Sequence, residues 1–299
     1  MCDCVRVENV CKRFGKLFTL DDISFSVSQG ECFCIFGRSG SGKSVLIRIL
    51  AGLEKPDSGR VAGIDTPPAT LLHLGIPSTN LTVLEELWLY AVLYGIPSVE
   101  RRSAIRKVLE LVGLDARKSC KVSDLSDAQV AALDLARALL SPSNILLLDE
   151  PMLHLDKPTR TRVWEYLLSA KVRRKKIIIM ASSNAEDAEM CDRVVLLHEG
   201  RTLAVGTPFE LCSIVGQEAL IVTPIGKPSK NVEKCKSAVV AKQQDGSFLV
   251  ECVDKTKPLD VFTQVPAAIS AVRIQPCSLD SVLEELIARN VRKQAVDSS

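Results

Sequence analysis

The sequence lacks the long apolar runs and the excess of one charge that mark membrane-spanning and nucleic-acid-binding proteins. Its longest apolar runs, such as 177–181 and 194–197, are far shorter than the roughly 18 residues of a membrane span. Lys and Arg number 38 and Asp and Glu number 36, so the net charge is +2. This near-balance provides no electrostatic basis for nucleic-acid binding. We therefore expect no direct membrane insertion and no nucleic-acid partner.

The sequence also lacks a recognisable targeting segment and a metal-binding cysteine pattern. Its first residues contain no basic and apolar stretch of the signal-peptide kind, and Cys2 replaces the glycine that myristoylation requires. The eleven cysteines include no C-x-x-C pair, and the three histidines flank no cysteine pair. We expect a cytosolic chain whose cysteines are buried, reduced thiols.

The hydrophobic pattern switches between strand-like and helix-like periods, which predicts an α/β fold with a parallel sheet. A capping box at Thr82 and a 3.6-residue apolar period up to Gly113 predict a helical insert, at about 82–140. After 211 the chain has short apolar segments separated by Lys, Pro, Gly and Asp, typical of a small α+β domain, which we place at 216–299. The expected strands are 5–10, 23–27, 31–36, 145–148, 177–181, 193–197, a short one after Gly200, 219–223, 237–241 and 247–252.

One segment matches a phosphate-binding motif in full. Residues 37–44 read G-R-S-G-S-G-K-S, which fits G-x-x-x-x-G-K-[ST] between a predicted strand and a predicted helix. Glycines let main-chain N–H groups surround a phosphate, and the helix N-terminus adds the positive end of its dipole. We expect Lys43 to bind the β- and γ-phosphates and Ser44 to bind Mg²⁺. The candidate nucleotide-binding residues are Gly37, Arg38, Ser39, Gly40, Ser41, Gly42, Lys43 and Ser44.

Two acidic residues complete such a site. Asp149 and Glu150 follow the apolar run 145–148, which is typical of a strand buried on both faces of a parallel sheet. We expect Asp149 to hold Mg²⁺ through water, and Glu150 to orient and deprotonate the attacking water. Nucleotide kinases and GTPases share this loop and acidic strand, so the region before the strand has to discriminate between them.

That region resembles the ATP-binding-cassette (ABC) ATPases. Residues 125–129 (L-S-D-A-Q), 135–139 (L-A-R-A-L) and 145–151 (I-L-L-L-D-E-P) resemble that family's L-S-G-G-Q, A-R-A-L and L-L-L-D-E-P. Phe14 resembles its adenine-stacking aromatic residue. Agreement in unbroken order over about 5–211 identifies the chain as a member. Residues 278–286 (S-L-D-S-V-L-E-E-L) are similar to a helix that ends many exporter-type cassettes.

The resemblance implies an ATP-binding domain at 1–211, with a mostly parallel sheet, an antiparallel β subdomain and a helical subdomain. It implies two cassettes that enclose two ATP molecules head to tail, each between the phosphate loop of one subunit and the signature loop of the other. This adds Ser126 and Gln129 to the binding residues. The implied cofactors are ATP and Mg²⁺.

The partners implied are a second ABC ATPase subunit, identical or different, and a transmembrane permease. The resemblance therefore implies an ATP-hydrolysing transporter subunit, of an exporter in particular, held peripherally on the cytoplasmic face of the membrane.

Three departures from the family pattern predict slow hydrolysis. Asp127 replaces a signature glycine and brings a carboxylate toward a bound γ-phosphate. Ser183 occupies the position of the family's histidine, and the stretch 59–81 is shorter than the family's and has no glutamine. Ser126 and Gln129 also form a capping-box pattern, so helix capping is an alternative role for them.

Two other interpretations stay open. One is a catalytically degenerate regulatory module that uses ATP occupancy as a switch, and the other is one half of an asymmetric cassette heterodimer. A cassette acting on DNA or ribosomes is disfavoured, because the chain has neither long coiled-coil arms nor a second cassette. A kinase is disfavoured by the signature-like helix.

Overall fold

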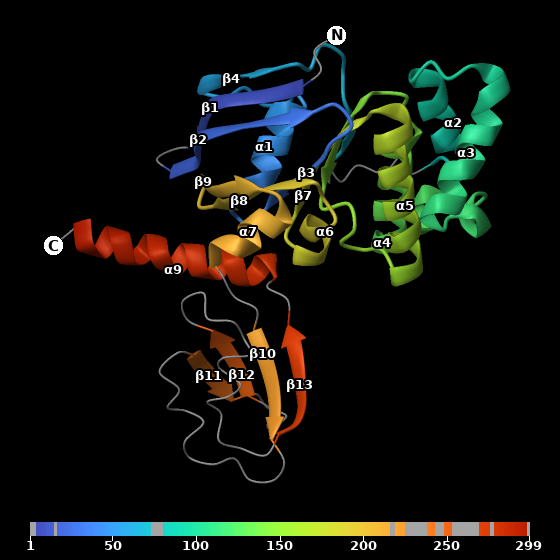
Figure 1. Cartoon of the computed structure of the whole chain (residues 1–299). Helices are drawn as coiled ribbons and strands as arrows, with labels where there is room; N and C mark the ends of the chain where they lie inside the picture. The colour runs from blue at the N-terminus through green and yellow to red at the C-terminus, as the bar shows by residue number, and fades with distance from the viewer. Residues whose placement is uncertain are drawn as a thin grey trace. The chain divides into compact units, whose positions relative to one another are not determined.

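The computed structural model describes residues 4–14, 17–72, 80–215, 219–224, 238–242, 248–252, 269–275 and 278–297. The chain divides into two compact units, Met1–Thr207 and Pro208–Ser299. The first unit has two sheets and the second has one, and each unit has helices of its own (Figure 1).

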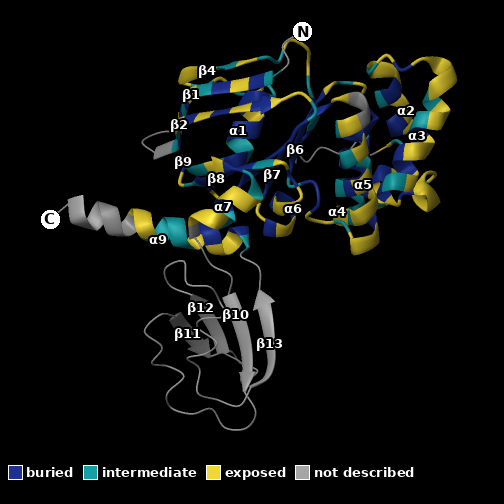
Figure 2. Ribbon diagram, viewed as in Figure 1, coloured by how far each residue is buried: buried dark blue, intermediate teal, exposed yellow. Residues whose placement is uncertain are grey.

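A six-stranded sheet forms the centre of the first unit. Its order is β5 (Ala69–Leu71), β6 (Ile145–Asp149), β7 (Ile177–Ser182), β3 (Cys32–Phe36), β8 (Arg193–His198) and β9 (Arg201–Gly206). The first five strands are parallel, and β9 pairs antiparallel with β8. Every residue of β3, β6 and β7 is buried, as their continuous apolar runs predict (Figure 2). The predicted α/β fold with a parallel sheet is confirmed.

A second, antiparallel sheet belongs to the same unit, in the order β2 (Leu17–Ser28), β1 (Cys4–Phe14) and β4 (Ser58–Ala62). Helix α1 (Lys43–Leu50) packs in one apolar cluster with residues of both sheets. Its Leu46 and Ile47 are fully buried there. The start of α1 is therefore held firmly, which matters because the predicted phosphate loop leads into it.

A helical segment is inserted between β5 and β6. It contains α2 (Val83–Leu93), α3 (Ser98–Val112), the 3₁₀ turns η1 (Asp115–Arg117) and η2 (Val122–Asp124), and α4 (Asp127–Leu140). The predicted capping box is present, because Thr82 Oγ1 accepts from Glu85 N–H and Glu85 Oε2 accepts from Thr82 N–H. Helix α3 ends at Gly113 in a left-handed conformation, also as predicted. Figure 1 shows α2 and α3 together at one side of this unit.

Two more helices flank the central sheet, α5 (Lys157–Arg174) and α6 (Ala185–Glu189). The second unit contains α7 (Pro208–Val215), an antiparallel sheet and α9 (Leu279–Asp297). That sheet has the order β11 (Ala238–Lys242), β12 (Phe248–Cys252), β10 (Ala219–Pro224) and β13 (Ile269–Gln275). Hydrophobic patterning does not predict β4, β5 or β13, since β4 is mostly exposed and β5 has three residues.

The cysteines only partly follow the prediction of buried thiols. Cys32, Cys34 and Cys191 are buried and free, and Cys32 Sγ lies 3.5 Å from Cys191 Sγ. The hydrogen bond with Cys191 and burial raise the pKa of the Cys32 thiol well above its ordinary value. The prediction is wrong for Cys4, Cys11, Cys120 and Cys212, which are partly exposed.

Candidate nucleotide-binding site

The predicted phosphate loop (residues 37–44) connects β3 to α1. Gly42 precedes the first helical residue at φ 102°, a left-handed conformation that favours glycine. A Cβ atom at Gly42 would lie 2.6 Å from the carbonyl oxygen of Thr19 and 2.8 Å from Leu20 Cδ2, so no side chain fits there. The close approach to β2 thus fixes the conformation of the loop, and glycine permits it.

A hairpin distant in sequence supports the same loop. Glu199 and Gly200, both with positive φ, form the two-residue turn between β8 and β9. The N–H of Gly200 donates to the carbonyl of Ser41 at 3.0 Å, and its own carbonyl accepts from Asp21 N–H at 2.7 Å. The turn therefore connects the phosphate loop to β2 through main-chain hydrogen bonds.

A pocket of about 370 Å³ opens at the phosphate loop. This volume lies within the usual range for small-molecule sites, roughly 300–1,000 Å³. The pocket unites six predicted site residues with four others from β2, α1 and the turns after β6 and β7. The predicted residues are Ser39, Gly40, Gly42, Lys43, Ser44 and Glu150, and the others are Thr19, Val45, Leu153 and Ser183.

Lys43 is the buried cation of this pocket. Its side chain is 6% exposed, and Nζ donates to the carbonyl oxygens of Gly37 at 2.7 Å and Arg38 at 3.0 Å. Nζ also lies 3.7 Å from Glu150 Oε1. The ammonium group is therefore held inside the loop, where it can attract an anion that the main-chain N–H groups surround.

Glu150 also lines the pocket and is held by main-chain contacts. Its φ is 45°, and its N–H donates to the carbonyl of Ala181 at 2.9 Å. The N–H of Ser183 donates to Glu150 Oε2 at 3.1 Å. Ser183 lacks the imidazole of the family's histidine, but its main chain still orients the carboxylate that we expect to activate water.

Asp149 and Ser41 lie buried beside the pocket rather than in its lining. Within the part of the chain that the structure describes, Asp149 Oδ1 and Ser41 Oγ have no hydrogen-bond partner. A buried carboxylate oxygen without a partner is costly and indicates a ligand. Carboxylate, hydroxyl and water oxygens are the ligands that Mg²⁺ prefers. The donor set of Asp149 and Ser44 therefore fits Mg²⁺.

Phe14 ends β1, and the residue is half exposed (50%). The ammonium group of Lys12 lies over its ring, 5.4 Å from the centroid. Phe14 is not among the residues that line the pocket, although it pairs with Leu17 in the hairpin that leads to Thr19.

Ser126 and Gln129 form the N-terminal cap of α4. Ser126 Oγ accepts from Gln129 N–H at 3.4 Å, and Gln129 Oε1 accepts from Ser126 N–H at 3.0 Å. The hydrogen bonds of the predicted capping box are therefore present. Ser126 and Asp127 are both exposed. Neither predicted signature residue lines the pocket, and their action on the nucleotide of another subunit stays a prediction.

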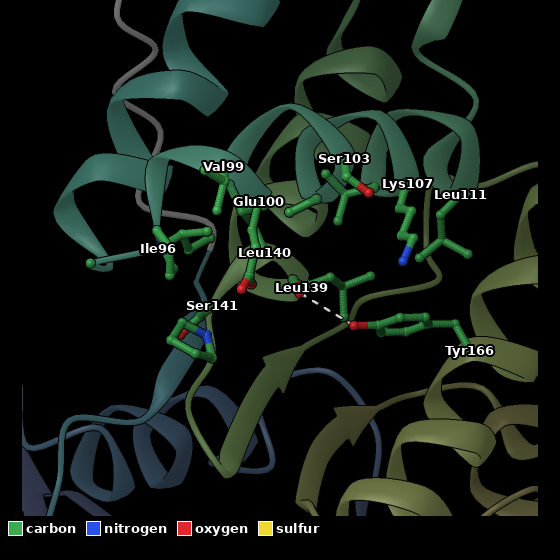
Figure 3. A pocket seen from close by; sticks show the side chains of 15 residues that line it. Ile96, Val99, Glu100, Ser103, Lys107, Leu111, Leu139, Leu140, Ser141 and Tyr166 are labelled. Atoms are coloured by element: carbon green, nitrogen blue, oxygen red, sulfur yellow. Dashed lines mark hydrogen bonds between the residues drawn. The ribbon is translucent and has the colours of Figure 1, made fainter.

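A larger pocket of about 670 Å³ lies elsewhere in the first unit (Figure 3). Helix α3, the end of α4 and Tyr166 of α5 line it, and Tyr166 Oη donates to the carbonyl of Leu139 at 3.4 Å. Its lining is mostly apolar and includes none of the predicted site residues.

The segment 73–79, where the family's glutamine would be sought, lies outside the described residues.

Comparison with known proteins agrees with the geometry. The family model described as "ABC transporter" matches residues 20–153. Two relatives named "Nod factor export ATP-binding protein I" are similar over 95% of this chain and 97% of their own length. The protein from Burkholderia thailandensis is 30% identical and that from Burkholderia lata is 33% identical.

Solved structures show the same fold. The ATP-binding subunit of an ABC transporter superposes with a TM-score of 0.65 at 25% identity, over 71% of this chain and 93% of that chain. A dimeric ATP-binding cassette bound to ADP and phosphate has a TM-score of 0.62 at 24% identity, over 68% and 98% of the two chains. None of the helices that the structure describes is long and apolar enough to cross a bilayer.

Proposed function

Because the chain belongs to the ABC transporter family and is one of its ATP-binding ATPase subunits, we propose that it hydrolyses MgATP slowly at the phosphate-loop pocket and drives an export permease. The observation that carries this proposal is the joining of Lys43 and Glu150 in one pocket, with a 3.7 Å separation of their charged atoms. A γ-phosphate bound beside Lys43 would lie next to the carboxylate that activates water.

The residues divide the chemistry among them. Lys43 and the loop N–H groups bind the phosphates, and Ser44 and Asp149 would hold Mg²⁺, which neutralises charge on the phosphates when it is bound. Glu150, oriented by the N–H of Ser183, accepts a proton from the attacking water. Phe14 stacks on the adenine.

The slow rate follows from what the site lacks. Ser183 offers a main-chain N–H but no imidazole, and a positioned acid–base group contributes typically 10²–10⁴ in rate. Asp127 adds a negative charge at an exposed helix start where a second subunit's phosphate would approach. Ser183 therefore affects the site at this chain's own phosphate loop, whereas Asp127 affects the site at the second subunit's phosphate loop.

The partners proposed are a transmembrane permease and a second ATPase subunit, with the chain peripheral on the cytoplasmic face of the membrane. Export is supported by the relatives, which are named as Nod factor export ATP-binding proteins. The alternative of an asymmetric heterodimer is supported by α4, because its Ser126 and Gln129 bond to each other while this chain's own phosphate loop retains its motif.

The test compares the purified chain with its Lys43→Ala and Glu150→Gln variants. We expect saturable, magnesium-dependent ATP binding that Lys43→Ala abolishes. Glu150→Gln keeps the binding and lowers hydrolysis by about 10²–10⁴. Titration with a fluorescent ATP analogue and a phosphate-release assay measure the two. Unchanged ATP affinity in Lys43→Ala would contradict the assignment of the site.

A further inference from the structure

We propose that Lys12 is a positioning residue for Phe14, and that it strengthens binding of the adenine base of ATP. This inference rests on the role proposed above for Phe14. It concerns a lysine that no motif singles out.

The strand geometry places the two side chains together. Lys12 and Phe14 lie two residues apart at the end of β1, where the pairing with β2 is irregular. Lys12 Nζ lies 5.4 Å from the centroid of the Phe14 ring, within the roughly 6 Å of a cation–π contact. Phe14 is half exposed, so part of its surface is open to a base while Lys12 lies over the ring.

The ammonium group of Lys12 is fixed, unlike that of an ordinary surface lysine. Its Nζ donates to the carbonyl of Lys55 at 2.7 Å and lies 2.9 Å from Glu54 Oε1 and 3.4 Å from Asp57 Oδ1. These three acceptors match the three donors of an ammonium group. The hydrogen bond to Glu54 raises the pKa of Lys12, with a further contribution from Asp57, so the side chain keeps its charge.

All three acceptors belong to the turn that follows α1. Helix α1 begins at the phosphate loop and ends at Leu50, and the turn carries the acceptors at 54–57. Asp57 also holds β1 directly, because its Oδ2 accepts from Arg13 N–H at 2.8 Å and its N–H donates to the carbonyl of Cys11 at 2.9 Å. Helix α1 and the turn that follows it therefore connect the phosphate loop to the strand end that carries Phe14.

This connection has a consequence for ligand recognition. Lys12 sets where the ring of Phe14 lies relative to the phosphate loop, so a nucleotide whose phosphates are bound meets a ring already in place. A cation behind the ring also withdraws electron density from its free face, which favours stacking of an electron-rich purine. The effect concerns the base alone and leaves the triphosphate unaffected.

The experiment measures the affinity of the full chain for MgATP and for magnesium tripolyphosphate, which has no base. We expect Lys12→Met to weaken MgATP binding about two- to fivefold, the range of a partly exposed cation–π contact, and to leave tripolyphosphate binding unchanged. Lys12→Gln, which keeps a hydrogen-bond donor but removes the charge, should give the same result. The matched control is Lys55→Met, because Lys55 contacts Lys12 through its carbonyl and its side chain can be removed with the same change of charge.

A double-mutant cycle separates the two proposals. In the Phe14→Ala background, Lys12→Met should have no further effect on MgATP affinity. If Phe14→Ala itself leaves the ratio of the two affinities unchanged, the adenine role of Phe14 is wrong and the role of Lys12 fails with it. If Phe14→Ala lowers that ratio but Lys12→Met does not, or weakens both ligands equally, only the positioning role of Lys12 is overturned.

Discussion

At the scale of single residues, the contact between Ser183 and Glu150 explains how a departure from the family pattern can preserve part of a site. The N–H of Ser183 donates to Glu150 Oε2 at 3.1 Å, and any residue type except proline has this donor. The strained φ of 45° at Glu150 places the carboxylate for that contact. Orientation of the carboxylate is therefore separable from the acid–base chemistry that a side chain at position 183 could add.

The variant Ser183→His tests this separation. Because the main-chain donor persists, we expect the imidazole to raise the rate of ATP hydrolysis by at least about tenfold, a modest share of the 10²–10⁴ typical of a positioned acid–base group. ATP affinity should change little. Steady-state phosphate release measures the rate, and Ser183→Gln is the control of similar size that cannot titrate. Equal rates in the two variants would show that the missing histidine does not limit turnover.

At the scale of elements, two helices begin with the same device. Helices α2 and α4 each have a complete capping box, formed by Thr82 with Glu85 and by Ser126 with Gln129. The glutamate in the first box keeps a lowered pKa because the N–H and hydroxyl of Thr82 donate to it. The box at Thr82 has only a structural role, whereas the box at Ser126 belongs to the predicted signature helix. Mutating each of them therefore compares helix capping with nucleotide binding in one chain.

We expect Thr82→Ala and Ser126→Ala each to lower the free energy of unfolding by about 1 kcal/mol, the usual cost of losing an N-cap side chain. Neither should change the affinity of the isolated chain for ATP, because neither residue lines the pocket. Urea denaturation and nucleotide titration provide the two measurements. A selective loss of ATP affinity in Ser126→Ala would place the signature helix in this chain's own site.

Element patterns also show what could be predicted from the sequence. Residues 37–44 and 149–150 are predictable because their chemistry depends on residue types at fixed spacing within one short segment. Thr19 and Gly200 join the site through main-chain atoms of segments distant in sequence, and no side-chain pattern encodes those contacts. Strand β4 escapes prediction because its mostly exposed residues carry little apolar period.

At the scale of the whole molecule, ligand binding and stability are linked. A ligand that binds only the folded state at 100 times its Kd stabilises it by about 2.7 kcal/mol. For a unit of roughly 200 residues we expect MgATP to raise the Tm by about 5–10 °C. Differential scanning fluorimetry over a range of MgATP concentrations measures the shift. Lys43→Ala should show none, and a shift that persists in this variant would point to a second nucleotide site.

The hairpin turn at Glu199 and Gly200 has one more consequence, which concerns the phenotype of mutations at position 200. A Cβ at position 200 would come within 2.5 Å of the Thr19 carbonyl oxygen, and the same peptide unit braces Ser41. A missense change there lies some 160 codons downstream of the motif it supports. It would nevertheless produce the phenotype of a lesion in the motif itself, and second-site suppressors are to be sought around codons 19 and 41.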